Sequence, residues 1–415
     1  MTEQKKDAEK EAAEKKGKEE NWFEIKISRR EFIKKGVMAA AGIAASWYAI
    51  DNLLFKKSFT GFGSKPSSDT FPNDAPSSLW KWSKEAYHYS KIGNNVKCYV
   101  CPNGCILENG ERSVCRNKVN VNGKLYTLAY GNPCSVHIDP IEKKPLFHFL
   151  PTTTSFSIAT AGCNFRCLNC QNWTISQSKP EDTTNYDMMP EKVVELALER
   201  GCASIAYTYS EPTAFYEYMY DTSKIAKGVG VKNVWVTNGY INEEALKDLC
   251  QYIDAANVDL KSFDEQIYNK LNSGMLNPIL NTLKVLKNQG VWFEVTNLVV
   301  PTWTDDLDMI RDMCKWLKRN VGPDYPLHFS RFHPEYKLKH LPATPVKFLE
   351  DARQVAIEEG IKFVYIGNVP NHMAENTYCP KCEEILIERK GYTIVQNNLQ
   401  NGVCKFCGEE IAGVW

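Results

Sequence analysis

Three cysteines lie close together in the chain, at Cys163, Cys167 and Cys170, with the spacing C-x3-C-x2-C. Three thiolates on one short loop suit an iron–sulfur cube, because each thiolate binds one iron. A cube has four irons, so this loop leaves one iron without a protein ligand, and an open metal position can bind a substrate or a cofactor. The spacing alone also fits a structural zinc loop or unrelated core thiols.

A second group of cysteines precedes this loop, with the spacing C-x2-C-x3-C-x9-C. Its members are Cys98, Cys101, Cys105 and Cys115. Turn-forming residues at 102–104 allow the chain to fold back so that the sulfurs converge. Four thiolates this close predict either a tetrahedral zinc site or an auxiliary iron–sulfur cluster. Redox-active thiols or disulfides are the alternative.

A third group near the C-terminus has the pattern C-x2-C…C-x2-C, with a β-rich segment at 385–395 between the two pairs. Its members are Cys379, Cys382, Cys404 and Cys407. This pattern is typical of a zinc ribbon, and rubredoxin-type iron is the lesser alternative. A module this small needs a metal in order to fold, so we expect zinc here.

The composition supports metal sites and argues against a nucleic-acid partner. The 15 cysteines of this 415-residue chain fall mostly in clusters, which favours metal ligation over disulfides. Cys202, Cys250 and Cys314 stand apart in strand-like or helical segments and are expected to be inert core residues. Lys+Arg and Asp+Glu both number 50, so no net positive charge attracts nucleic acid.

The segment that must position the cysteine loop alternates between strand-like and helix-like stretches. Strands are expected at 156–159, 204–209, 233–237, 255–260, 291–300, 327–331 and 362–366. Such alternation predicts parallel strands joined by crossover helices. The expected fold class is therefore α/β, a partial (βα)6-type barrel, with polar residues at the carboxyl ends of the strands, where barrel enzymes place their sites.

The N-terminal residues predict a charged tail followed by an export signal. Residues 28–34, S-R-R-E-F-I-K, resemble the twin-arginine signal, and an apolar run follows at 36–50. A basic tail before an anchor helix is the alternative, and an uncleaved signal would tether the protein to a membrane. The expected division is tail and signal 1–57, linker 58–84, cysteine-rich module 85–150, barrel 151–370 and zinc-ribbon-like module 371–415.

Several sequence blocks resemble the radical S-adenosylmethionine (SAM) superfamily, and more closely its AmmeMemoRadiSam branch, which is related to the glycyl-radical (pyruvate formate-lyase) activating enzymes. One block is the cysteine loop with the Q-N-W that follows it. The others are Y-T-Y-S-E-P-T at 207–213, V-T-N-G-Y at 236–240, D-L-K at 259–261, V-P-T-W-T-D at 300–305 and R-F-H-P-E-Y-K at 331–337. The combination is far more specific than any single block.

The resemblance implies a mechanism and a set of partners. Cys163, Cys167 and Cys170 would hold a 4Fe–4S cluster whose fourth iron chelates SAM. An electron from a low-potential donor such as ferredoxin or flavodoxin would cleave SAM, and the resulting radical would abstract a hydrogen atom from a protein, a peptide or a small molecule. Glycyl-radical activation is one option. The alternative is a metal-binding or electron-transfer protein that does not cleave SAM. Because SAM is supplied in the cytoplasm, this chemistry favours an enzyme on the cytoplasmic side of the membrane. That location conflicts with an export signal.

The resemblance also implies roles for residues at the strand ends. Glu211 would contact the SAM ammonium, although a Glu before Pro is also favourable at a helix start. Asn238 and Gly239 would approach the ribose or methionine, with a simple turn as the alternative. Asp259 and Lys261 point the same way on a strand and predict an ion pair, which either serves the SAM carboxylate or is structural.

Two further features concern the substrate and the adenine. His333, Glu335, Tyr336 and Lys337, which follow the sixth strand, are candidates for substrate contact, and His372 is a similar candidate. A hydrogen-bonded structural role is the alternative for a lone histidine. The position before the third cysteine is usually aromatic in the superfamily, and here it is Asn169. Any ring packing against adenine from this position is therefore absent.

Overall fold

The computed structural model describes residues 79–415. The charged tail, the twin-arginine-like segment and nearly all of the expected linker lie outside the described residues. Within 79–415, none of the helices has both the length and the apolar content needed to cross a bilayer.

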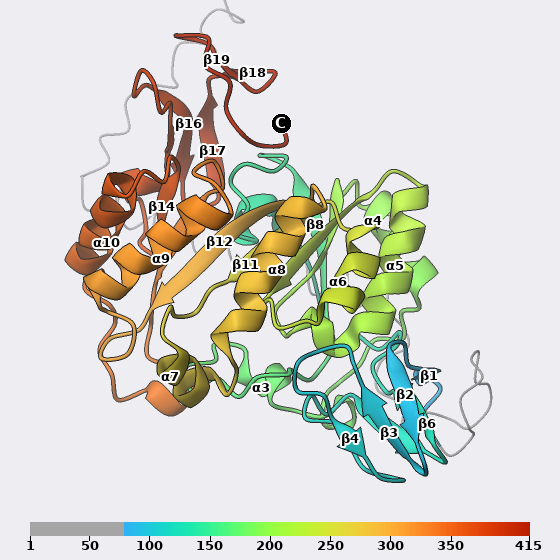
Figure 1. Ribbon diagram of the computed structural model, residues 1–415. Helices are drawn as coiled ribbons and strands as arrows, with labels where there is room; N and C mark the ends of the chain where they lie inside the picture. Colours follow the sequence, from blue (N-terminus) through green and yellow to red (C-terminus); the bar gives the residue numbers. More distant parts are fainter. Residues whose placement is uncertain (1–78) are drawn as a thin grey trace, which may run out of the picture. The chain divides into compact units, whose positions relative to one another are not determined.

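An eight-stranded sheet, with the order β14-β13-β12-β11-β10-β9-β8-β7, forms the body of the fold (Figure 1). Its strands are β7 (Ser135–Pro140), β8 (Thr154–Ala159), β9 (Ser204–Tyr207), β10 (Lys232–Thr237), β11 (Ala255–Asp259), β12 (Trp292–Val299), β13 (Leu327–Arg331) and β14 (Val364–Gly367). Strands β8 to β14 pair in parallel, and β7 pairs antiparallel with β8. The expected α/β barrel is confirmed, and the order has two free ends, so the barrel is open.

Two strands extend this sheet beyond a (βα)6 arrangement. The parallel strand β14 is a seventh, and the antiparallel β7 was not predicted from the sequence. Because β7 begins at Ser135, the barrel sheet starts earlier in the chain than the expected domain boundary at 151.

Crossover helices cover one face of the sheet (Figure 1). They are α4 (Pro190–Glu199), α5 (Tyr216–Gly228), α6 (Glu243–Cys250), α8 (Leu276–Asn288), α9 (Leu307–Asn320) and α10 (Val346–Glu358). Helix α9 illustrates why these segments are helical. The Asp306 side chain accepts hydrogen bonds from the first backbone N–H groups of the helix. Its buried side chains repeat at helical spacing, at Ile310, Met313, Cys314 and Leu317.

Short helical turns lie in the loops between these elements. They are η1 (Ile141–Lys143), α3 (Trp173–Ser176), η2 (Pro180–Asp182), η3 (Pro212–Phe215), α7 (Glu265–Ile267), the π-helical η4 (Tyr268–Asn272), η5 (Tyr336–Leu338) and η6 (Met373–Glu375). The helical stretch at 212–228 is thus divided into η3 and α5. Turns α3, η3, η4 and η5 follow carboxyl ends of parallel strands, which is the end that carries the cysteine loop.

The amino-terminal end of the barrel is closed by an apolar cluster. It consists of Ile141, Leu146, Phe149, Ala206, Val234 and Ala255, all fully buried. The first three residues come from the segment between β7 and β8, and the others lie near the beginnings of β9, β10 and β11. This end is therefore packed, which leaves the carboxyl end of the strands for chemistry.

The cysteine-rich module before β7 is built from two small antiparallel sheets, β1-β6-β5 and β2-β3-β4. The strands are β1 (Lys84–Glu85), β2 (Tyr89–Ile92), β3 (Asn95–Cys98), β4 (Ile106–Leu107), β5 (Lys118–Val121) and β6 (Lys124–Thr127). Cys98 ends β3 and Cys105 directly precedes β4, so the pairing of these strands brings the two cysteines together.

The C-terminal module consists of β15 (Thr377–Tyr378), β16 (Ile385–Lys390) and β17 (Thr393–Asn397) in one sheet, and β18 (Leu399–Gln400) with β19 (Val403–Cys404) in another. The expected β-rich segment between the cysteine pairs is confirmed. Side chains of this module pack with Phe147, Phe363 and Tyr365. Phe363 directly precedes β14, so the module lies at the amino-terminal end of the parallel strands.

Candidate functional site

The C-x3-C-x2-C loop follows β8 directly and begins at a glycine that no other residue can replace without strain. Gly162 has φ +98°, and a Cβ atom there would lie 2.5 Å from the carbonyl oxygen of Cys115. Asn117 fixes the same point, because its Nδ2 donates to the carbonyl of Ala161 at 2.7 Å. The loop therefore starts in close contact with the cysteine-rich module.

Of the three thiols of this loop, those of Cys163 and Cys167 are buried and that of Cys170 is half-buried. Burial raises the pKa of all three thiols, and the neighbouring Cys167 raises the pKa of both Cys163 and Cys170 further. Their sulfurs are not gathered as for a single metal ion, since within 79–415 only the C-terminal cysteines have sulfurs within 4.8 Å of one another. This wider spacing fits a group with several metal atoms.

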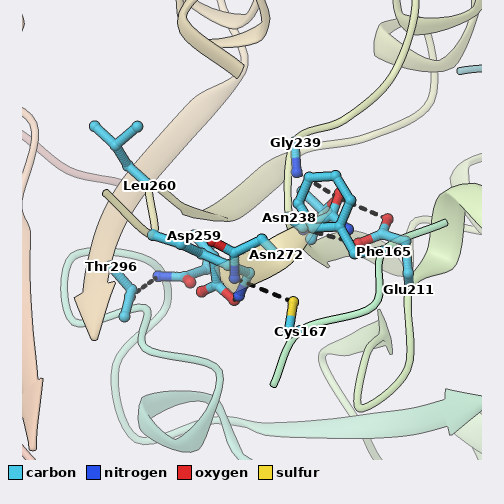
Figure 2. A network of polar contacts seen from close by, with 12 residues as sticks. Phe165, Cys167, Glu211, Asn238, Gly239, Asp259, Leu260, Asn272 and Thr296 are labelled. Carbon is cyan, nitrogen blue, oxygen red and sulfur yellow. Dashed lines mark hydrogen bonds and ion pairs between the residues drawn. The ribbon is translucent and has the colours of Figure 1, made fainter. Parts of the chain in front are cut away.

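Asn272, at the end of the π-helical turn η4, holds the middle cysteine of the loop. Its Nδ2 donates to Cys167 Sγ at 3.2 Å, as Figure 2 shows. Its carbonyl also accepts the backbone N–H of Arg166 at 3.0 Å. Hydrogen bonds to ligand sulfurs tune iron–sulfur clusters. The sequence analysis missed Asn272, because it lies 105 residues from Cys167 and no local pattern marks it.

A chain of side-chain amides joins the loop to the end of β10. Asn238 Nδ2 donates to Asn164 Oδ1 at 2.8 Å, and Asn164 Nδ2 donates to the carbonyl of Tyr240 at 2.9 Å. Asn238 Oδ1 accepts the backbone N–H of Tyr240 at 2.9 Å. Asn238, which the sequence analysis selected, therefore positions the loop, whereas Asn164 was missed.

Glu211 lies at the start of η3 and fastens the ends of β9 and β10 together (Figure 2). Its Oε1 accepts from Thr213 N at 2.9 Å and from Thr237 Oγ1 at 2.8 Å, and its Oε2 accepts from Asn238 N at 2.8 Å. Burial raises the pKa of this carboxyl. Three donors already occupy the carboxylate, and through one of them Glu211 orients Asn238. Contact of Glu211 with the ammonium group of SAM stays a prediction.

Asp259 and Lys261 form the expected ion pair at the end of β11, with Lys261 Nζ 2.7 Å from Asp259 Oδ2. The Lys261 side chain is one-fifth exposed, and its charge lies near Cys167, where it lowers the thiol pKa against the effect of burial. The pair therefore presents one positive and one negative group beside the cysteine loop. Whether it binds SAM stays a prediction.

Gly239 has a packing reason for being glycine. Its φ is +69°, and a Cβ atom would lie 2.9 Å from Val258 Cγ1 and 3.2 Å from Ile279 Cγ2. These neighbours belong to β11 and α8, so the simple turn accounts for the residue.

The surroundings of the loop fit a bound group with polar parts. Asn169 Oδ1 and Asn272 Oδ1 are both buried and accept no hydrogen bond from the described residues. Buried polar atoms rarely lack a partner, so each is suited to a donor from a ligand. Asn169 directly precedes Cys170, where it takes the place of the usual aromatic ring.

Of the residues selected for substrate contact, those of η5 lie closest to the loop. Lys337 N donates to the carbonyl of Leu168 at 3.1 Å, and the ring of Tyr336 stacks on Trp173 with centroids 5.2 Å apart. The Glu335 carboxylate accepts from Trp173 Nε1 at 3.3 Å.

The two candidate histidines show no such contact. His333 is exposed. His372 caps η6, where its Nδ1 accepts from Ala374 N at 3.1 Å, and it therefore has a structural role.

The C-terminal cysteines have the spacing of a single tetrahedral metal ion. Cys379 Sγ lies 3.6 Å from Cys407 Sγ, and Cys382 Sγ lies 3.7 Å from Cys404 Sγ. A Zn–S bond of about 2.3 Å in a tetrahedron separates the sulfurs by about 3.8 Å. The arrangement is thus compatible with a zinc-ribbon-like site.

The first cysteine group surrounds a different kind of space. Cys98, Cys101, Cys105 and Cys115 all line one hollow. None of the 15 cysteines, which all fall within the described residues, forms a disulfide. The disulfide alternative considered for this module is therefore not supported.

One family model and several relatives match this chain. The family model described as "Radical SAM superfamily" matches residues 157–317. An uncharacterized protein of Methanocaldococcus jannaschii, MJ0808, is 51% identical over 331 residues, which are 79% of this chain and 98% of that protein. The pyruvate formate-lyase 1-activating enzyme of Escherichia coli is 24% identical over 220 residues, 49% of this chain and 89% of that enzyme.

A solved domain of a pyruvate-formate lyase-activating enzyme from Bacteroides vulgatus aligns with a TM-score of 0.36 and 14% identity. The alignment covers 40% of this chain and 99% of that domain. The residues matched by the family model include the cysteine loop and the strand ends that carry Glu211, Asn238 and Lys261.

Proposed function

We propose that this protein, which has a radical SAM domain at residues 157–317, is an enzyme that cleaves SAM reductively and abstracts a hydrogen atom from a protein or peptide substrate. The observation that carries this proposal is the arrangement of the three thiols of Cys163, Cys167 and Cys170. Two of them are buried and Cys170 is half-buried, and their sulfurs do not all lie within 4.8 Å of one another as they do in the C-terminal group. Such a set suits a 4Fe–4S cluster with one open iron.

The protein's own residues would bind and orient the cofactors. When bound, the cluster and SAM supply a 5′-deoxyadenosyl radical through one-electron cleavage of the sulfonium bond. Asn272 would stabilise the thiolate of Cys167 through its N–H···S hydrogen bond. Lys261 and Asp259 offer opposite charges beside the loop, which suits the carboxylate and the ammonium of SAM.

A protein or peptide substrate is supported by two observations. The relatives include enzymes named as activators of pyruvate formate-lyase, which is itself a protein. The aromatic pair of Trp173 and Tyr336 lies against the cysteine loop, and the Trp173 side chain is 36% exposed. Exposed aromatic rings are common anchors for a polypeptide partner. Glycyl-radical activation is the specific reaction that we propose, and membership of the AmmeMemoRadiSam branch stays a prediction.

The experiment is a direct measurement of SAM cleavage. Anaerobically reconstituted protein is reduced with dithionite and mixed with SAM, and 5′-deoxyadenosine is quantified by mass spectrometry. We expect product from the wild type and only background from Cys163→Ala. The matched control is Cys250→Ala, since this cysteine lies in α6 away from the metal-binding groups and should leave product formation unchanged.

The result that would overturn the proposal is wild-type product no greater than that of Cys163→Ala in protein that retains its iron. That result would favour the alternative, a metal-binding or electron-transfer protein that does not cleave SAM. With product confirmed, candidate glycyl-radical proteins can be tested by electron paramagnetic resonance (EPR) for a glycyl radical that forms only when this enzyme and SAM are present.

A further inference from the structure

We propose that Cys98, Cys101, Cys105 and Cys115 hold an auxiliary iron–sulfur cluster that passes electrons to the cluster on the C-x3-C-x2-C loop. The binding site stands on its own geometry, and only its electron-transfer role rests on the proposed function. The sequence left zinc and an iron–sulfur cluster equally open for this group. The arrangement of the sulfurs now separates the two.

The chain carries its own reference for a single metal ion. In the C-terminal group the paired sulfurs lie 3.6 and 3.7 Å apart, close to the roughly 3.8 Å expected around tetrahedral zinc. The first cysteine group is not gathered in this way, since the C-terminal group alone among residues 79–415 has its sulfurs within 4.8 Å of one another. Its sulfurs are thus further apart than zinc requires.

The four thiols nevertheless belong to one site. All of them line the same hollow. The backbone brings two of them together, since Cys98 N donates to the carbonyl of Cys105 at 2.9 Å. Four thiols that line one hollow but are not gathered as for a single ion suit a group with several metal atoms between the sulfurs.

The surroundings of the hollow are suited to negative charge. Lys118 lines it, and the Lys118 side chain is 2% exposed. Its Nζ pairs with Glu217 Oε1 at 2.5 Å, and Glu217 is fully buried. A buried lysine is costly unless it compensates negative charge, and thiolate ligands supply such charge. Lys118 therefore serves both the carboxylate and the thiolates of the site.

Hydrogen bonds to the sulfurs also resemble those around redox clusters. Val114 N donates to Cys105 Sγ at 3.5 Å, and Ser113 Oγ lies 3.1 Å from Cys115 Sγ. Donors to ligand sulfurs help to set the reduction potential of an iron–sulfur cluster.

The hollow shares a wall with the cysteine loop after β8. Asn164, which directly follows Cys163, lines the hollow, and its carbonyl accepts from Asn103 Nδ2 at 2.9 Å. On the other side Gly162 is in close contact with the Cys115 carbonyl. The middle of the first cysteine group, at Asn103, and its last residue, Cys115, therefore contact the residues on either side of Cys163.

This contact favours a redox group over zinc, which has no redox chemistry. A reduced ferredoxin or flavodoxin would give one electron to the auxiliary cluster and become oxidised. The auxiliary cluster would give that electron to the cluster on the loop and return to its oxidised state. The electron would then cleave SAM in the step described above.

The first experiment tests the site without using SAM cleavage. The triple variant Cys163→Ala/Cys167→Ala/Cys170→Ala is purified anaerobically and reconstituted, and its iron, acid-labile sulfide and zinc are measured. We expect iron and sulfide in equal amounts, together with about one zinc from the C-terminal group. Adding Cys101→Ala and Cys105→Ala should remove the iron and sulfide and leave the zinc.

Circular dichroism of the two multiple variants shows whether each is folded. About two zinc ions per chain and no sulfide in a folded triple variant would overturn the proposal. Iron and sulfide that persist after the two further substitutions would also overturn it, because they would then be held elsewhere. A triple variant that does not fold is replaced by wild type, in which Mössbauer spectroscopy must resolve two clusters, only one of which responds to SAM.

The second experiment tests the electron-transfer role. Cys101→Ala/Cys105→Ala is prepared with the loop cysteines intact, and its SAM-responsive EPR signal confirms that the loop cluster is present. We expect cleavage supported by reduced flavodoxin to fall at least tenfold, while cleavage supported by dithionite falls less. Equal rates with flavodoxin in wild type and variant would overturn the role.

A variant that removes the charge of Lys118 tests its electrostatic role, because a purely structural role would leave the reduction potential of the cluster unchanged. In Lys118→Met/Glu217→Gln the buried pair is replaced together, which avoids leaving one charge unpaired. Lys118 lines the hollow and Glu217 does not, so loss of the positive charge should outweigh loss of the carboxylate and lower the reduction potential of the auxiliary cluster, measured by EPR-monitored titration of the triple variant. An unchanged potential contradicts the placement of Lys118 beside a cluster.

These experiments separate the two proposals. Iron and sulfide in the triple variant with no 5′-deoxyadenosine from wild type would leave the auxiliary site standing and remove the proposed function. SAM cleavage by wild type, together with zinc in the first cysteine group, would support the proposed function and remove the auxiliary cluster.

Discussion

The Nδ2 atom of Asn272 lies 3.2 Å from Cys167 Sγ and donates a hydrogen bond to it. Asn272 ends the π-helical turn η4, so the geometry of this turn is transmitted directly to the middle cysteine of the loop. A hydrogen bond to a charged partner contributes about 1.5–3 kcal/mol. The strength of this one contact should therefore appear in the reduction potential of the cluster.

We expect Asn272→Leu to lower the reduction potential and to slow SAM cleavage about tenfold, because the N–H···S bond stabilises the more negative, reduced state. The measurement is an EPR-monitored redox titration alongside 5′-deoxyadenosine formation. The matched control is Asn281→Leu on α8, whose amide pairs with Glu243 at the surface. An unchanged potential in Asn272→Leu would show that the contact does not influence the cluster.

Glu211→Gln should weaken the connection between β9 and β10. The amide NH₂ of glutamine would face a donor, either Thr213 N or Asn238 N, where the carboxylate now accepts. We expect the free energy of unfolding to fall by about 2 kcal/mol and SAM binding to weaken about tenfold, because an unsatisfied buried donor costs about 1–3 kcal/mol. Urea unfolding and equilibrium binding measure the two effects, with the exposed Glu199→Gln as control.

If SAM bound Glu211 directly and nothing else depended on it, the substitution would weaken binding without changing the free energy of unfolding. That outcome would contradict the positioning role.

The barrel and the cysteine groups could be predicted from the sequence because their signals are local. The strands that became β8 to β14 are short apolar runs separated by helical periodicity, and the cysteine spacings lie within a few residues. The ion pair of Asp259 and Lys261 was likewise predicted, since alternate residues of a strand share a face.

What could not be predicted depends on contacts between distant residues. Strand β7 contains His137, Asp139 and Pro140 and has no apolar run, so it is a strand only because β8 pairs with it. The contact of Asn272 with Cys167 and the contact of Gly162 with Cys115 have the same origin. The hydrogen bond from Asn238 N to the Glu211 carboxylate, 27 residues away, could not be foreseen either.

Loss of zinc from the C-terminal module should affect stability more than catalysis. The module packs on Phe363 and Tyr365 at the amino-terminal end of the strands, whereas the cysteine loop follows their carboxyl ends. We expect Cys382→Ala to lose zinc and to lower the melting temperature, with SAM cleavage at 20–25 °C within about twofold of wild type. A loss of cleavage comparable to that of Cys163→Ala would contradict the separation of the two ends.

Stability should fall in acid partly because of His148. Burial lowers the pKa of His148 to about 4 from its usual 6.5, although the Glu294 carboxylate acts in the opposite direction. Between these values the unfolded chain binds a proton that the folded protein does not, so stability decreases as the pH falls from about 6.5 to about 4, by about 3 kcal/mol. Below pH 4 this contribution no longer changes.

The measurement is the free energy of unfolding from pH 7 to pH 4 for His148→Gln and wild type. The variant should lose less stability over this range, because glutamine does not titrate. His340→Gln, at an exposed position, should behave as wild type. A variant with the same pH dependence as wild type would exclude His148 as the source.

The stacked rings of Trp173 and Tyr336 should protect the iron on the cysteine loop. The rings are 5.2 Å apart at 15°, and the next residue, Lys337, donates its backbone N–H to Leu168 between two of the cysteines. Removing the stack would free η5 from the loop and admit solvent. We expect Trp173→Ala to release iron to a chelator several-fold faster, since aromatic pairs of this kind contribute about 0.5–1.5 kcal/mol. The control is Trp173→Phe, which keeps a ring but loses the hydrogen bond to Glu335. Near-normal iron release from this variant would assign the effect to stacking. Equal iron release from wild type and Trp173→Ala would show that the rings do not cover the loop.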